Sequence, residues 1–230
     1  EIVSRGQMAI FLARAFSLEV DAVVPFKDIS QAMASYPYIK RMIAAKLTAG
    51  YSDNTFRPNQ QVTRSQFSAF LARGLNPAFK VEFPVQLSYQ RNTAKVYHYE
   101  SNSTGSYYYR LSDREYAGWY LWNVYEENVY SYSFLENEAI QGYYIGYPYS
   151  EFHELIRYPI VLGKTWDGYG EMPDYYSITG TDLTVTTPAG TFHNVVAVSA
   201  EDWTQYFAPG TGNIKTTKNG ETDSQLVRIE

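Results

Sequence analysis

Residues 50–74 read Gly-Tyr-Ser-Asp-Asn-Thr-Phe-Arg-Pro-Asn-Gln-Gln-Val-Thr-Arg-Ser-Gln-Phe-Ser-Ala-Phe-Leu-Ala-Arg-Gly, a turn-rich loop followed by an amphipathic helix. The helical half already occurs at the start of the chain, where residues 3–14 read Val-Ser-Arg-Gly-Gln-Met-Ala-Ile-Phe-Leu-Ala-Arg. Residues 62–73 align with that segment position by position. An internal repeat therefore organises the first part of the chain.

The apolar spacing in this part of the chain is that of helices. Three helices are predicted, over residues 2–16, 36–47 and 64–74. Ser35 is the expected N-cap of the second helix, and Gly50 is expected to adopt the left-handed conformation that closes it. The other two helices begin with capping boxes, in which a hydroxyl and a glutamine three residues later cap each other. These boxes are Ser4 with Gln7 and Thr63 with Gln66.

Each capping box is followed by an arginine at the first helical position, Arg5 or Arg64. A cation there opposes the helix dipole by about 0.3 to 1 kcal/mol, so helix stability does not favour it. A helix N-terminus offers free backbone N–H groups, and a guanidinium beside them suits a carboxylate or a phosphate. The sequence thus predicts anion binding. The alternative is that each arginine is solvated, or is paired with Asp28 or Asp53.

The composition changes near residue 80. Residues 1–80 contain 10 Lys and Arg against 5 Asp and Glu, whereas residues 81–230 contain 9 against 19. Of the 23 tyrosines, 20 follow residue 80, and so do all four tryptophans. A basic module and an acidic, aromatic module have different partners. We therefore predict two domains, residues 1–78 and 82–230.

After residue 85, short runs of aromatic and β-branched residues alternate with polar ones and are separated by turn residues. About ten antiparallel strands are predicted, beginning around Leu87 and Tyr89, in a curved or barrel-like sheet. Only residues 151–156 are a candidate helix. The fold class is thus α+β: helical repeats followed by an antiparallel all-β domain.

The first part of the chain resembles a known family. Residues 25–75 are similar to one complete S-layer homology repeat, and residues 2–16 resemble the closing helix of a preceding repeat. The motifs that carry the resemblance are Phe26-Lys27-Asp28, Gly50-Tyr51-Ser52-Asp53-Asn54-Thr55-Phe56-Arg57-Pro58 and Val62-Thr63-Arg64-Ser65-Gln66. In that family, three repeats pack as a pseudo-threefold unit. The unit holds proteins non-covalently on secondary cell wall polysaccharide of Gram-positive bacteria, often through a pyruvylated sugar.

The resemblance implies that the ligand is an anionic wall polysaccharide. Its signature Thr-Arg-Ala-Glu gives the ligand-contacting role to Arg64 and Arg5, with Thr63 and Ser4 as caps. Glutamine replaces the family's glutamate in both copies, which keeps the capping box and removes a charge. The predicted polysaccharide site comprises the residues of these motifs: Arg64, Thr63, Arg5, Ser4, Asp28, Gly50 and Ser52. Further repeats or other copies of the chain are expected to complete the module.

The β domain carries weaker signals. Its aromatic residues form either a platform for sugar rings or, by alternation along strands, the core. Carboxylates for glycoside hydrolysis exist, but sequence does not reveal their spacing. These candidates are Glu126, Glu127, Asp167 and Asp174. The three histidines are scattered, so no metal site is predicted, and no cofactor motif is present. We interpret the chain as non-enzymatic; a wall-associated carbohydrate-active enzyme or glycan-binding β domain and a structural lattice protein are the alternatives.

Other classes are disfavoured by composition. The chain lacks cysteine, which excludes disulfides and zinc-thiolate sites. No segment approaches the roughly 18 apolar residues of a membrane span. Basic residues occur singly, so nucleic acid is not an expected partner. A secreted protein held at the cell wall is the expectation, with a leader removed or a preceding segment missing before Glu1.

Overall fold

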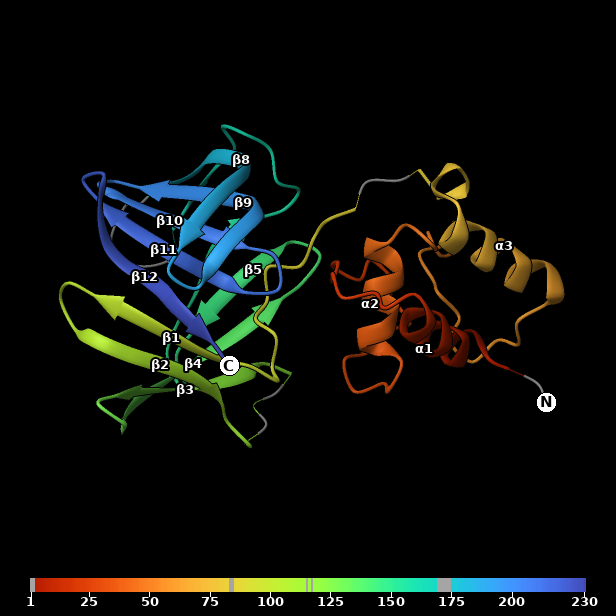
Figure 1. Ribbon diagram of the computed structural model, residues 1–230, viewed down its shortest axis with the longest axis horizontal. Coiled ribbons are helices and arrows are strands. Elements are labelled where there is room, and N and C mark those ends of the chain that lie inside the picture. The colour runs from red at the N-terminus through yellow and green to blue at the C-terminus, as the bar shows by residue number, and fades with distance from the viewer. Residues whose placement is uncertain (1–2, 83–84, 115, 117, 169–174) are drawn as a thin grey trace. The chain divides into compact units, whose positions relative to one another are not determined.

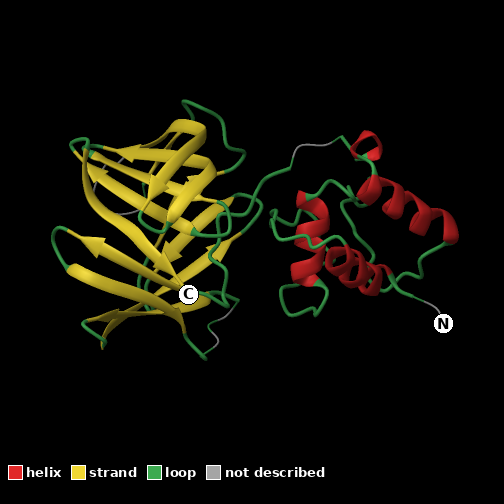
Figure 2. Ribbon diagram, in the orientation of Figure 1, coloured by secondary structure: helices red, strands yellow, loops and turns green. Residues whose placement is uncertain are grey.

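The computed structural model describes residues 3–82, 85–114, 116, 118–168 and 175–230 (Figure 1). The chain divides into two compact units, Glu1–Ser88 and Tyr89–Glu230. Among the residues described, the helices fall in the first unit and the strands in the second (Figure 2). Each unit has its own buried cluster of apolar side chains, and each is therefore considered separately.

The first unit contains helices in the three segments where the apolar spacing predicts them: α1 (Arg5–Ala15), α2 (Tyr36–Ala44) and α3 (Arg64–Leu75), followed by the short 3-10 helix η1 (Pro77–Phe79). The start of the first predicted helix, at residue 2, lies outside the described residues. No helix in the described part of the chain has the length and apolar character needed to cross a membrane.

Two details of α2 differ from the sequence prediction. Ser35 makes no side-chain capping bond, because its own backbone is already helical (φ −83°, ψ −11°). The left-handed residue after α2 is Lys46 (φ 59°), so the helix ends before Leu47. Gly50 is left-handed as well (φ 68°), but it lies further along the loop and does not close the helix.

Loops supply part of the core of the first unit. Phe26 and Phe56 are buried side by side, with ring centroids 5.6 Å apart, although neither belongs to a helix. They pack with apolar residues of all three helices, which include Leu12, Ile39 and Phe70. The loop that contains Phe56 is therefore fixed by the core, which gives its polar residues defined positions.

The first unit extends to Ser88, beyond the predicted domain end at residue 78. The backbone N–H of Val23 donates to the carbonyl of Gln86 at 2.8 Å, and that of Ser88 donates to the carbonyl of Asp21 at 3.0 Å. Leu87 makes only an isolated bridge to Ala22, so the strand expected around Leu87 and Tyr89 does not form. These bonds attach the segment to the helical unit instead of to the sheet.

The second unit is one antiparallel sheet. It has twelve strands in the described residues instead of about ten: β1 (Val96–Ser101), β2 (Gly105–Leu111), β3 (Tyr120–Glu126), β4 (Val129–Glu138), β5 (Gly142–Gly146), β6 (Phe152–Arg157), β7 (Thr165–Asp167), β8 (Tyr175–Thr187), β9 (Gly190–Ala200), β10 (Trp203–Ala208), β11 (Gly212–Lys218) and β12 (Glu221–Ile229). The candidate helix at residues 151–156 is wrong: this segment is β6, which pairs with β5. The turn at Asn219-Gly220, with positive φ at both residues, joins β11 to β12 as a tight hairpin.

The sheet curls into a nearly closed barrel (Figure 1). The strand order is β6-β5-β4-β3-β2-β1-β12-β11-β10-β9-β8-β7, so β6 and β7 are the two edges. A side-chain bond joins these edges: the indole Nε1 of Trp166 on β7 donates to the carbonyl of Glu154 on β6 at 2.9 Å. β6 and β7 are therefore joined by a side-chain hydrogen bond and not by backbone pairing, so the barrel is closed everywhere except between these two strands.

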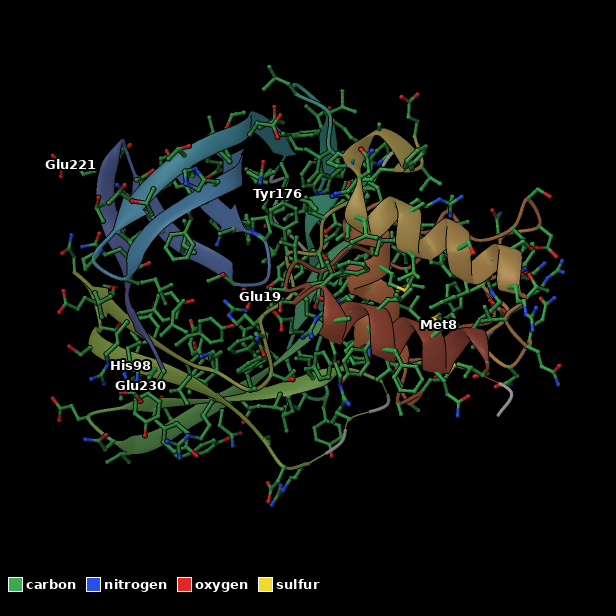
Figure 3. The ribbon with its side chains drawn as sticks, turned by 45° about the vertical axis from the view of Figure 1, so that its right-hand side comes forward. Met8, Glu19, His98, Tyr176, Glu221 and Glu230 are labelled. Carbon is green, nitrogen blue, oxygen red and sulfur yellow. The ribbon has the colours of Figure 1, made fainter. Side chains whose placement is uncertain are left out.

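Alternation sorts the aromatic residues between the two faces of the sheet. Tyr97 and Tyr99 on β1 are buried in the core of the second unit, and Tyr107 and Tyr109 on β2 pack against that core. Tyr108, between them on β2, packs against the His98 ring at a tilt of 34°, with centroids 5.2 Å apart. His98 in turn lies beside Glu230 (Figure 3), 3.3 Å away. The interpretation that alternate aromatics fill the core is confirmed for these strands.

Candidate functional site

The starts of α1 and α3 have the same local structure. The backbone N–H of Gln7 donates to Ser4 Oγ at 3.2 Å, and that of Gln66 donates to Thr63 Oγ1 at 3.2 Å. Each glutamine side chain accepts the backbone N–H of its capping residue in return. Both capping boxes are therefore confirmed, and local sequence alone explains them.

The two arginines differ in their environment. Arg5 is only 4% exposed. Its Nε donates to the carbonyl of Phe56 at 2.7 Å, and its guanidinium lies 4.7 to 5.4 Å from the rings of Tyr51, Phe56 and Phe70. Burial lowers the pKa of Arg5, although Tyr51 partly opposes this effect. Arg5 is thus a packed cation held by aromatic rings and one carbonyl, and it pairs with neither Asp28 nor Asp53.

The backbone N–H groups at the start of α1 are already occupied. The N–H of Arg5 donates to the carbonyl of Gln60, and that of Gly6 donates to the carbonyl of Pro58, both at 2.8 Å. Together with the bond from Gln7 to the cap, these bonds use the first three helical donors. The expectation of free donors beside Arg5 is therefore wrong, because residues 58–60 cover this helix end.

The start of α3 is open. Arg64 is exposed, and the backbone N–H groups of Arg64 and Ser65 have no hydrogen-bond partner among the residues that the structure describes. Among the described residues after α3, none donates or accepts a backbone hydrogen bond at this helix start in the way that residues 58–60 do at α1. The same sequence therefore yields a covered helix end at α1 and an available one at α3.

The aspartates predicted near the site shape the loop. Asp28 accepts the backbone N–H groups of Phe56 at 2.8 Å and Arg57 at 2.7 Å. Asp53 accepts the hydroxyl of Thr55 and an Arg57 Nη2 hydrogen; these contacts, the first above all, lower the pKa of Asp53. Ser52 lies exposed in the turn beside Asp53. The two aspartates hold the loop in its shape through these bonds.

Arg57 is a candidate ligand residue that the sequence reasoning did not select. It is exposed, has positive φ (59°), and its guanidinium lies 4.0 Å from the centroid of the Tyr51 ring. The Tyr51 hydroxyl also accepts a hydrogen bond from Gln66 Nε2 at 3.1 Å, which links this loop to the start of α3. The available signal was the Arg57-Pro58 pair inside the quoted motif.

Packing against Phe26 requires a glycine at position 50. A Cβ added there would lie 2.2 Å from an atom of the Phe26 ring, and the positive φ disfavours any L side chain. Gly50→Ala is therefore expected to destabilise the helical unit by about 2 to 4 kcal/mol. Urea unfolding followed by helical circular dichroism measures this loss.

A matched variant separates the two causes. Gly220→Ala also has positive φ (83°), but nothing lies within 4 Å of its added Cβ, so only the conformational cost of about 1 to 2 kcal/mol is expected. Because Gly220 lies in the β unit, its loss is followed by tryptophan fluorescence, which reports on that unit. Equal losses for the two variants would show that the Phe26 contact is unimportant.

The acidic candidates of the β unit lie on separate elements. Glu126 ends β3 and Glu127 lies in the following turn, whereas Asp167 ends β7. Across the seam between β6 and β7, three strands separate β3 from β7. Asp174 lies outside the described residues. No group of three His, Asp or Glu side chains in the described chain could hold a metal ion.

Comparison with known proteins finds a similarity for the helical unit. Residues 25–68 match the S-layer homology domain. A segment of 51 residues is 43% identical to an endoglucanase of Bacillus sp. (strain KSM-635); it covers 22% of this chain and 5% of that enzyme. This match covers only the region of the S-layer homology domain. No solved structure matches the chain significantly.

Proposed function

We propose that the helical unit anchors this protein at the bacterial cell surface by binding an anionic polysaccharide of the cell wall. The observation that carries the proposal is the open start of α3, where exposed Arg64 stands beside two backbone N–H groups without partners in the described structure. A guanidinium and free helical donors together suit a carboxylate or a pyruvate ketal on a sugar.

The charge of the helical unit supports an acidic ligand. Residues 1–80 have a formal net charge of +5, from 10 basic and 5 acidic side chains. Arg57 and Arg64 are both exposed, and Tyr51 contacts residues of both their segments, the Arg57 guanidinium and the Gln66 amide. Two exposed cations on linked segments give an extended acidic polymer more than one contact.

Arg5 contributes to this function mainly by positioning. It is buried beneath the rings of Tyr51 and Phe56, so its removal disturbs the loop that carries Arg57. By analogy with α1, a further repeat or another copy of the chain would supply a loop to cover the start of α3. The resemblance to a threefold family unit favours a further repeat.

Arg64→Ala is expected to weaken binding to purified wall polysaccharide by about 5- to 30-fold, the loss of one charge-assisted contact of about 1 to 2 kcal/mol. Arg64→Lys should bind with intermediate affinity, because lysine keeps the positive charge but lacks the two parallel N–H donors of the guanidinium group. Sedimentation with insoluble wall polysaccharide at several salt concentrations measures the change, and higher salt should weaken wild-type binding.

Lys80→Ala is the matched control, because it removes one exposed positive charge from the same unit away from a helix start. It should retain nearly full binding. Equal retention of Arg64→Ala and wild type would exclude the site at α3, and salt-independent retention would exclude the electrostatic mechanism.

The β unit is proposed to be displayed outside the wall without catalysing a reaction. The endoglucanase match favours the alternative of a wall-associated carbohydrate-active enzyme, but it covers only the region of the S-layer homology domain and identifies no catalytic residue in the β unit. Release of reducing sugar from wall preparations would instead establish a carbohydrate-active enzyme. Concentration-dependent assembly of the purified chain into sheets would establish the structural lattice protein.

A further inference from the structure

The β unit contains a partly open pocket of about 250 Å³. Side chains from eight of its strands line this space, so it lies on the inner face of the barrel. Arg91, Tyr143 and Phe207 are buried at one end, whereas Tyr132 and Tyr147 are 41% and 44% exposed at the other. The cavity is thus a closed-ended pocket with a tyrosine mouth. Its volume lies just below the range of about 300 to 1,000 Å³ typical of small-molecule sites.

The buried end of the pocket is polar but electrically balanced. Arg91 Nη1 lies 2.9 Å from Glu136 Oε1, and both side chains are at least 95% buried. Glu136 also accepts hydrogen bonds from Tyr143 and Trp122. The Arg91 Nε, in contrast, is buried without a hydrogen-bond partner in the described structure. This nitrogen has almost no accessible surface, so a ligand in the pocket does not reach it. Because Glu136 already neutralises Arg91, the buried end offers no unpaired charge to a ligand.

The walls of the pocket are tyrosine rings. Tyr99, Tyr107 and Tyr109 form a cluster with centroid distances of 4.8 to 5.5 Å. Burial raises the pKa of Tyr107 to about 12 and that of Tyr109 well above its ordinary value, so both phenols are protonated at neutral pH. Aromatic faces pack against the C–H faces of a ring, while phenol hydroxyls both donate and accept hydrogen bonds.

The remaining lining excludes two other ligand classes. Gln205, Asn213, Thr216 and Ser224 place amides and hydroxyls on β10, β11 and β12, the strands that follow β1 in the sheet, and this polar lining disfavours an acyl chain. A free phosphate or carboxylate would have to compete with Glu136 for Arg91, at the cost of desolvating a second anion. A small, uncharged ring with several hydroxyl groups satisfies both the aromatic and the polar lining.

We infer that the barrel cavity binds one neutral sugar residue, either a free monosaccharide or the end of a glycan. The sugar ring lies against the tyrosine cluster, and its hydroxyl groups form hydrogen bonds with the amides and hydroxyls that line the pocket. This site is separate from the helix start that holds the wall polymer, so either can fail without the other.

Saturation-transfer NMR of the full chain tests the inference. The probes are glucose, galactose, N-acetylglucosamine and their short oligomers at millimolar concentration, with inorganic phosphate and an apolar dye as the alternative classes. Ser224→Leu adds an apolar side chain to the pocket lining on β12, and it should weaken sugar binding at least tenfold. The matched control is Gln225→Leu, whose side chain points to the outer face of the same strand and should leave affinity unchanged.

A second pair of variants tests the hydroxyl groups. Tyr132→Phe should weaken sugar binding about 2- to 10-fold, whereas Tyr130→Phe, which removes an outer-face hydroxyl from the same strand β4, should not. Monosaccharide binding with similar affinity to the oligomers supports a single-residue pocket, and tighter oligomer binding supports recognition of a glycan end. The inference would be overturned if no sugar bound, or if sugar binding survived Ser224→Leu. It would also be overturned if only phosphate or the dye bound and Ser224→Leu abolished that binding. Arg64→Ala, tested on wall polysaccharide, reports separately on the anchor.

Discussion

Glu136→Gln is expected to destabilise the β unit by about 3 to 5 kcal/mol, the largest effect of any single substitution considered. Glu136 is completely buried and accepts four hydrogen bonds, from the Nη1 and backbone N–H of Arg91, the hydroxyl of Tyr143 and the indole of Trp122. Burial by itself lowers the pKa of Arg91. The electrostatic effect of its neighbours Tyr143, Tyr99 and Glu136 outweighs burial, and the pKa is raised well above its ordinary value. The guanidinium thus stays charged and would be left without an anion.

Urea unfolding followed by tryptophan fluorescence measures this loss, because Trp122 lies beside the pair. Glu126→Gln is the control, since Glu126 also belongs to the β3–β4 hairpin but bonds an exposed serine, Ser131; a change within about 0.5 kcal/mol is expected. Replacing both partners, Arg91→Met with Glu136→Leu, should restore much of the lost stability. A loss below about 1 kcal/mol for Glu136→Gln would show that the pair is not a determinant of the fold.

Alkaline pH is the second strong perturbation. The pKa of Tyr107 is raised from 10.0 to about 12, with burial as the main cause, and burial also raises the pKa of Tyr99, Tyr109 and Tyr143. A raised tyrosine pKa means that the folded state binds more protons than the unfolded state above pH 10. The stabilisation is therefore complete below pH 10 and disappears as the pH rises to about 12. Tyr107 alone accounts for up to about 3 kcal/mol of this loss.

Urea titrations at a series of pH values between neutrality and about pH 12 measure the slope. Tyr107→Phe should flatten it, because the replaced phenol no longer needs to stay protonated. Tyr108→Phe is the matched control, since Tyr108 is the next residue of β2 and lies on the outer face, stacked on Tyr125. If Tyr107→Phe and Tyr108→Phe changed the slope equally, burial of Tyr107 would not be the source of the pH dependence.

The local sequence was sufficient wherever a bond spans only a few residues. The two capping boxes and the helices that follow them depend on neighbours in the chain, and they form as predicted. The hairpin at Asn219-Gly220 is likewise a local structure, since two adjacent residues with positive φ make its turn. Alternation likewise sorted Tyr107 from Tyr108. The strand β6 was missed because Glu154 and Arg157 interrupt its apolar pattern; the structure pairs them with each other on one strand.

Long-range contacts decided the rest. Arg5 and Arg64 occupy the same position in the same local motif, yet residues 56–60 bury the first and leave the second exposed. Nothing within either motif encodes that difference, because the covering loop is more than 50 residues from Arg5. In the same way, the sequence placed Arg91 and Glu136 in the β domain but gave no sign of their pairing across 45 residues. The repeat of residues 50–74 thus determined the helices and the candidate arginines, and tertiary packing determined which arginine is free to bind a ligand.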